Sequence, residues 1–162
     1  MPEAPIQKSV WLYGAPLLSV LVFMVDRLVK VYFYTRPELT INVIPQWLWL
    51  HLHLNTQMAL SLPLFPILYY SLTTIVCVAL IGQLVRMFQQ RKAIEYTLIL
   101  VILAGALSNL LDRIYYGGVV DYITVAIGSV FNIADSVIVL AVGIWIVRLF
   151  YYDHHKKVSA PR

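Results

Sequence analysis

The stretch GGVVDYITVAIGSVFNIADS, residues 117–136, contains two aspartates, Asp121 and Asp135, and no other charged residue. Gly117 and Gly118 stand shortly before Asp121 and supply a bend that could direct it back toward the rest of the protein. Asn132 and Asp135 are three residues apart, so they share a face if a helix begins here. A carboxylate at membrane depth is costly and is a functional candidate by default. Whether Asp121 and Asp135 lie at membrane depth depends on the sequence on either side of this stretch.

The flanking sequence is that of an integral membrane protein. Of the 162 residues, 60% are hydrophobic and only 12% are charged, and the mean hydropathy is +0.78. A helix needs roughly 20 apolar residues to cross a bilayer, and four stretches qualify: about 11–34, 64–87, 93–111 and 131–151. The predicted fold class is therefore an all-α membrane protein with four transmembrane helices, built as a single domain over residues 1–162.

The positive charges predict the orientation of these helices. Of the twelve Lys and Arg residues, one precedes the first predicted helix, three lie around the turn between the second and third, and four lie near the end of the fourth or beyond it. Cations accumulate on the cytoplasmic side of short loops, so both termini are expected to be cytoplasmic and both longer loops external. The same cations account for the basic balance of the chain without a nucleic-acid partner.

The first external region, about residues 40–62, is predicted to contain a small β element. Residues 47–55 read WLWLHLHLN, which alternates leucine with aromatic or polar residues at the period of a strand. Its tryptophans favour a position at the lipid–water boundary. His51 and His53 face the same way, but no carboxylate or cysteine nearby completes a set of metal ligands, so no metal site is predicted.

Further acids lie near the external ends of the predicted helices. Asp26 and Lys30 are four residues apart on one helix and are interpreted as a structural ion pair. Asn109 and Asp112 are three apart, with Arg113 adjacent, and could form a structural network or contact a substrate. Spacing alone leaves both readings open, as it does for Asp121 and Asp135.

The chain resembles the lipoprotein signal peptidase family, also called signal peptidase II. The resemblance spans nearly the whole chain and is carried by an ordered set: Asp26-x-x-x-Lys30, Asn55, GALSNLLDR (105–113), GGVVDYI (117–123) and FNIADS (131–136). It implies an aspartic endopeptidase of the bacterial cytoplasmic (inner) membrane that removes signal peptides from prolipoproteins at their diacylglyceryl-modified cysteine. It also implies an active site near the outer face and no metal or other cofactor.

The resemblance assigns roles to individual residues. Asp121 and Asp135 match the catalytic pair, and two carboxyls held close can share one proton and activate water. The other matches are Asn55, Asn109, Arg113 and Asn132, which correspond to polar positions lining the active site, and Asp112, which is expected to brace them. The partners implied are diacylglyceryl-modified prolipoproteins, membrane lipids and globomycin-like inhibitors, with the chain acting as a monomer.

Two alternatives remain open at the level of sequence. Gln57 and Leu60 stand where the family usually has glycine and phenylalanine, which keeps open a catalytically inactive paralogue that binds lipopeptide. A small proton- or cation-coupled transporter could also hold carboxylates within a helical bundle. The predicted position of the acidic residues argues against the transporter, because they gather near one face of the membrane and are not distributed across it.

Overall fold

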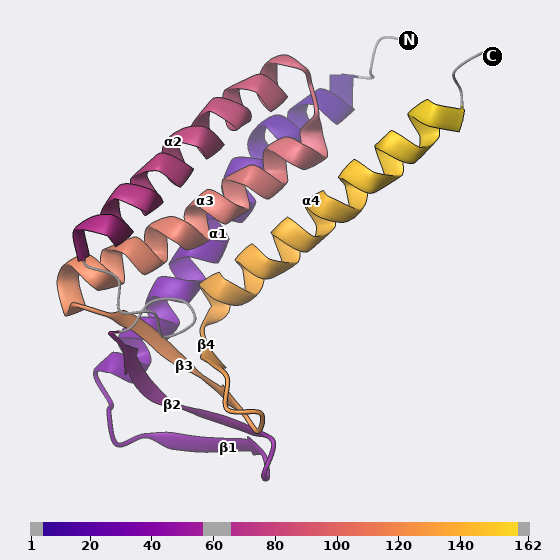
Figure 1. The fold of residues 1–162 in the computed structure, drawn as a ribbon. Helices are drawn as coiled ribbons and strands as arrows, with labels where there is room; N and C mark the ends of the chain where they lie inside the picture. The colour runs from indigo at the N-terminus through magenta and orange to yellow at the C-terminus, as the bar shows by residue number, and fades with distance from the viewer. Residues whose placement is uncertain (1–4, 57–65, 159–162) are drawn as a thin grey trace.

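The computed structural model describes residues 5–56 and 66–158 of the chain. Its helices are α1 (Pro5–Tyr34), α2 (Pro66–Gln89), α3 (Ala93–Tyr116) and α4 (Ile133–Val158). Its strands are β1 (Thr40–Ile44), β2 (Leu48–Asn55), β3 (Val119–Val125) and β4 (Val130–Phe131). The four helices run side by side, and the strands lie at one end of them (Figure 1).

Within the described residues, three helical segments are long and apolar enough to cross a membrane: Ser71–Gln89, Ala93–Tyr116 and Ile133–Phe150. They correspond to the second, third and fourth predicted spans. The first predicted span, 11–34, falls within α1 and is helical throughout, but residues 11–34 carry three charged side chains, Asp26, Arg27 and Lys30. The structure is thus mostly helical, with three membrane-capable helices and a small antiparallel sheet.

The helix ends differ from the prediction where local capping determines them. The third helix was predicted to end near residue 111, but α3 continues to Tyr116 and stops at Gly117, which has φ 71° and donates its N–H to the Arg113 carbonyl. A left-handed residue of this kind is the usual end of a helix and suits glycine. The fourth helix begins at Ile133 and extends to Val158, beyond the predicted end near 151.

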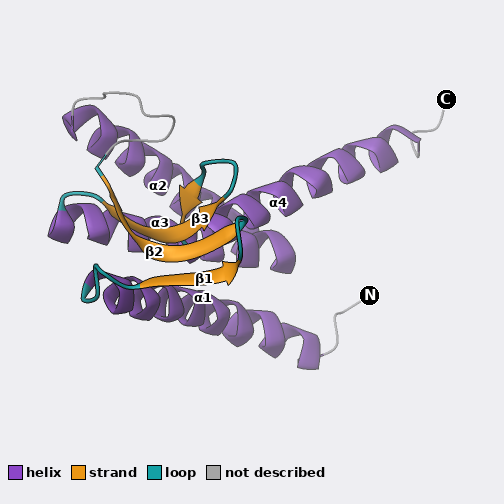
Figure 2. Ribbon diagram, turned by 90° about the horizontal axis from the view of Figure 1, so that it is seen from below, coloured by secondary structure: helices purple, strands orange, loops and turns teal. Residues whose placement is uncertain are grey.

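The sheet is larger than the sequence predicted. The strand at 48–55 is present, but the β element is not confined to the segment between the first two helices, because β3 and β4 join it from the segment between α3 and α4. The strand order is β1-β2-β3-β4 and every pair is antiparallel. Figure 2 shows this sheet lying across the ends of the helices. The predicted β region beyond Thr56 falls outside the described residues.

α3 is the helix against which the others are arranged, since it packs on α1, α2 and α4. It approaches α4 closely at Gly105, where an added Cβ would lie 2.9 Å from Ile138 Cγ1 and 3.1 Å from the Ala134 carbonyl oxygen. A glycine here permits close backbone approach. The end of α3 that bears Asn109 is thereby brought next to the beginning of α4.

Candidate active site

Asp121 lies in β3, in a segment for which the sequence predicted no strand. Its neighbours Val120 and Tyr122 are buried, and Asp121 itself is only 1% exposed. Gly118 lets β3 approach β2, because a Cβ there would lie 2.9 Å from the Asn55 carbonyl oxygen. This close approach brings the Asn55 side chain into reach, and Asn55 Nδ2 donates to Asp121 Oδ2 at 3.0 Å.

The pKa of the Asp121 carboxyl is raised toward neutral pH. Burial is the main cause and raises its pKa from 3.8 to about 6. The negative charge of Asp135 raises the pKa further, whereas the N–H groups donated by Asn55 and Asn132 favour the ionised form and lower it. A carboxyl of this kind can hold or release a proton near neutral pH, as an acid or base in catalysis must.

Asp135 lies in the first turn of α4, where the sequence predicted it. Asn132 stands at the N-cap of this helix, and its Oδ1 accepts the Asp135 backbone N–H at 2.9 Å. The side chain of Asp135 is half-buried, and its Oδ1 accepts a hydrogen bond from Asn109 Nδ2 at 2.8 Å. α3 and α4 therefore meet at this carboxylate.

Two asparagines connect the two carboxylates. Asn132 Nδ2 donates to Asp121 Oδ1 at 2.7 Å and to Asn109 Oδ1 at 3.2 Å. Asn109 in turn donates to Asp135. A hydrogen-bonded path thus runs from β3 through the N-cap of α4 and the end of α3 to the first turn of α4.

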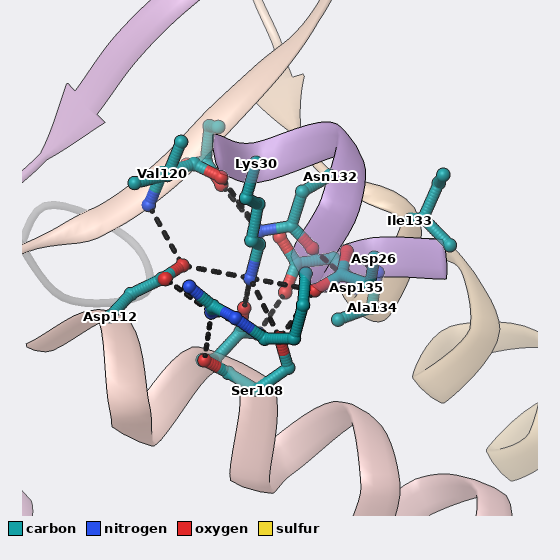
Figure 3. A network of polar contacts seen from close by, with 12 residues as sticks. Asp26, Lys30, Ser108, Asp112, Val120, Asn132, Ile133, Ala134 and Asp135 are labelled. Atoms are coloured by element: carbon teal, nitrogen blue, oxygen red, sulfur yellow. Dashed lines mark hydrogen bonds and ion pairs between the residues drawn. The ribbon is translucent and has the colours of Figure 1, made fainter. Parts of the chain in front are cut away.

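A buried cluster of ions lies beside this path (Figure 3). Lys30 Nζ is 3.0 Å from Asp26 Oδ2 and 2.8 Å from Asp112 Oδ2, and all three side chains are fully buried. Arg27 pairs with the other oxygen of Asp112, and Ser108 Oγ donates to Asp26 Oδ2. The pair of Asp26 and Lys30 expected from the sequence is present as part of this larger network.

The cluster also fixes the backbone next to each candidate carboxylate. Asp26 Oδ1 accepts the N–H of Ala134 at 2.9 Å, one residue before Asp135. Asp112 Oδ2 accepts the N–H of Val120 at 3.1 Å, one residue before Asp121. The ion cluster on α1 and α3 therefore determines where β3 and α4 place their carboxylates.

A third connection joins β3 directly to the start of α4. The Tyr122 hydroxyl oxygen accepts the Ile133 N–H at 3.2 Å, and the Tyr122 ring stacks on Phe33 with 5.1 Å between ring centroids. Burial raises the pKa of the Tyr122 hydroxyl, so this group stays neutral and can serve as a hydrogen-bonding anchor.

Most of the residues singled out from the sequence lie in this region. Those in the two networks are Asn55, Asn109, Asn132, Asp121, Asp135, Asp26, Lys30 and Asp112. Arg113 is half-buried in the last turn of α3, one residue beyond Asp112. Gln57 and Leu60 lie outside the described residues.

Arg27, Ser108 and Tyr122 were not among the predicted residues, although each is adjacent in sequence to one that was. Their partners are distant in the chain: Arg27 contacts Ser108 across 81 positions, and Tyr122 binds the first residue of α4. Local spacing carries no signal for such contacts.

The fold and the site together define a helical membrane protein with paired carboxylates buried where its bundle meets a small sheet. Comparison with known proteins identifies the family, since residues 18–151 match the family model described as signal peptidase (SPase) II. The chain belongs to the signal peptidase II family. It is therefore a peptidase of lipoprotein processing, and its apolar helices fit the bacterial inner membrane.

Individual relatives agree with this family. A lipoprotein signal peptidase of Blochmanniella pennsylvanica is 36% identical over 156 residues, which cover 90% of this chain and 91% of the relative. One from Listeria welshimeri is 26% identical over 147 residues, covering 87% and 96%. A solved structure of a bacterial membrane enzyme superposes with a TM-score of 0.75 at 27% identity, covering 93% of this chain and 96% of that one.

Proposed function

We propose that this chain is an aspartic endopeptidase that cleaves prolipoproteins immediately before their diacylglyceryl-modified cysteine, with Asp121 and Asp135 as its catalytic pair. The observation that carries the proposal is the connection of these carboxylates through Asn132 and Asn109. The pKa of about 6 for Asp121, raised mainly by burial and in part by the charge of Asp135, supports it, because a nearby like charge favours retention of a proton on one carboxyl of a pair.

The chemistry follows from one proton shared by two carboxyls. The ionised carboxylate takes a proton from a water molecule while the water oxygen attacks the scissile carbonyl carbon, and the protonated carboxyl donates to the carbonyl oxygen. The tetrahedral intermediate then collapses as the C–N bond breaks: the protonated carboxyl donates its proton to the leaving nitrogen, and the ionised carboxylate takes a proton from a hydroxyl of the intermediate, which restores the one shared proton. In this scheme Asn55, Asn109 and Asn132 hold the carboxyl oxygens in place, and Arg113 lines the substrate side.

We further propose that α1 is a fourth membrane span. Its 30 residues extend about 45 Å at the rise of an α-helix, against a hydrocarbon core of roughly 30 Å. Asp26 and Lys30 are fully buried toward the bundle, whereas Leu21, Val25 and Leu28 are exposed on the outside. The charges that lower the hydropathy of α1 therefore need not face lipid.

The orientation proposed from the sequence is compatible with this arrangement. α1 begins and α4 ends at the same end of the bundle as the α2–α3 turn, opposite the sheet (Figure 1). With cytoplasmic termini, the candidate site would lie near the outer face, where a lipid-anchored cysteine would hold its scissile bond. The four aspartates Asp26, Asp112, Asp121 and Asp135 gather in this one region, which disfavours a transporter.

The test is cleavage of a synthetic diacylglyceryl prolipoprotein peptide by the full chain purified in detergent, with products identified by mass spectrometry. We expect a single new N-terminus at the modified cysteine and no cleavage of the same peptide without its lipid. Binding without cleavage would instead identify the inactive paralogue. Cleavage at another bond, or equal cleavage of the unlipidated peptide, would contradict the proposed specificity.

A further inference from the structure

Lys30 makes one contact that its role as an ion-pair partner does not explain. An ammonium group has three donors and no acceptor, and Lys30 is fully buried. Two of its contacts go to the carboxylates of Asp26 and Asp112, at 3.0 and 2.8 Å. Its one short contact with an uncharged group, at 2.7 Å, goes to Asn109 Oδ1, while Ser108 Oγ lies farther away at 3.5 Å.

This contact favours one of the two orientations of the Asn109 amide. A side-chain amide has an acceptor on one branch and two donors on the other. Lys30 can only donate, so it requires Oδ1 of Asn109 to face it, and Nδ2 must then face the other way. In that orientation Nδ2 donates to Asp135 Oδ1 at 2.8 Å. A reversed amide would put a donor against the Lys30 ammonium and an acceptor against the Asp135 carboxylate.

The other bridging asparagine is oriented independently of Lys30. Asn132 Oδ1 caps α4 by accepting the Asp135 N–H, and its Nδ2 is thereby directed to Asp121. Asn109 has no helix to cap, since it lies within α3. Its Oδ1 accepts from Lys30 Nζ at 2.7 Å and from Asn132 Nδ2 at 3.2 Å, so the shorter and charged donor that orients Asn109 is Lys30.

We propose that Lys30 is a positioning residue of the peptidase, which holds Asn109 in the orientation that donates a hydrogen bond to Asp135. This role rests on the proposed catalytic function of Asp135, and it is additional to the pairing of Lys30 with Asp26. Figure 3 shows Lys30 between Asp112 on one side and Asp26 on the other, with Asp135 beyond. Because Lys30 acts on a reacting carboxylate through Asn109, its loss should lower kcat and leave KM little changed.

The test removes the ion pair as a unit, so that no buried charge is left without its partner. Asp26→Asn keeps an oxygen for the Ala134 N–H that Asp26 accepts, and it is combined with either Lys30→Met or Lys30→Gln. Asp112 retains Arg27 and the Val120 N–H in both variants. The two side chains at position 30 are neutral and similar in length, but only glutamine can donate an N–H to Asn109.

We expect the methionine variant to unfold cooperatively in detergent but to lose about 10- to 100-fold in kcat, the range associated with misplacement of a reacting group. The glutamine variant should recover part of that loss. The matched control is Glu95→Gln with Arg148→Met, which removes an ion pair of 3.1 Å that joins α3 to α4 and should retain the kcat of the unsubstituted chain.

Equal kcat in the methionine and glutamine variants would overturn the positioning role, and so would full activity in both. Failure of both variants to fold while the control folds would also count against it, because Lys30 would then be a requirement of the fold itself. These results are separate from failure of the proposed function, in which the unsubstituted chain would cleave no lipidated peptide.

Discussion

Each polar group of Asn132 has a separate task at the candidate site. Its Oδ1 caps α4 through the Asp135 N–H, and its Nδ2 contacts Asp121 and Asn109. Its backbone carbonyl accepts the hydroxyl of Ser136. N-cap side chains contribute about 1 kcal/mol to stability, so part of the reason for an asparagine here is structural. The N–H donated to Asp121 is the part that bears on chemistry.

The pKa of Asp121 should respond with opposite signs to changes in its two neighbours. Asp135→Asn removes a negative charge that raises this pKa, so we expect it to fall below about 6. Asn55→Ala removes a hydrogen bond that favours the ionised form, so we expect the pKa to rise above about 6. The measurement is the 13C shift of the Asp121 carboxyl as a function of pH in detergent micelles. Shifts of the same sign in both variants would contradict the proposed coupling.

Residues from several elements hold the start of α4 in place. The Tyr122 hydroxyl of β3 accepts the Ile133 N–H, and the Asp26 carboxylate of α1 accepts the Ala134 N–H. Asn132 accepts the next two N–H groups, that of Asp135 through Oδ1 and that of Ser136 through its backbone carbonyl. The first N–H groups of a helix have no partners within the helix. Their attachment to β3 and α1 fixes the first turn of α4, and hence Asp135, relative to Asp121.

The close approach of α3 and α4 at Gly105 should be required for this geometry. Gly105→Ala would place a Cβ 2.9 Å from Ile138 Cγ1 and 3.1 Å from a backbone oxygen of α4, so the Ile138 side chain must shift and the α4 backbone is crowded. We expect a lower thermal unfolding midpoint and a loss of turnover of about 10- to 100-fold. Gly143→Ala is the control, since nothing lies within 4 Å of its added Cβ. Equal effects of the two changes would show that the Gly105 contact does not set the site.

The elements differ in how far the sequence could predict them. The helices were predictable because each is a long apolar run, and β2 because its leucines alternate with polar or aromatic residues. β3 was not, since residues 119–125 (VVDYITV) are mostly apolar and resemble membrane-adjacent loop as much as strand. Pairing with β2 and β4, which follows from the tertiary fold, makes this segment a strand.

The whole molecule separates its polar site from its basic ends. The sheet lies at one end of the bundle, and the α2–α3 turn lies at the other (Figure 1). The four aspartates of the site contact β3 and the start of α4, at the sheet end. Spacing alone left the roles of Asp121 and Asp135 open, and the prediction that they form a pair came from the resemblance of the motifs around them to a known family. It could not predict that Asp26 would reach Ala134, 108 positions away, because that contact depends on how α1 and α4 pack.

This arrangement gives a topology that reporter fusions can test. Cations cluster on the cytoplasmic side of short loops, so a reporter after Arg162 or inserted near Gln90 should behave as cytoplasmic. One inserted near Glu38, between α1 and β1, should behave as external. An external C-terminus, or the same location for Gln90 and Glu38, would contradict the four-span orientation.

The most direct test of the account is turnover by variants of the carboxylate pair. Asp121→Asn and Asp135→Asn each remove an ionisable group while keeping its size, and a pair that shares one proton acts as a unit. Turnover of the lipidated peptide is measured per correctly folded molecule, with folding checked by cooperative thermal unfolding. We expect each single variant to lose nearly all activity and the double variant to be little worse than either. Appreciable turnover in either single variant would remove the pair from the mechanism.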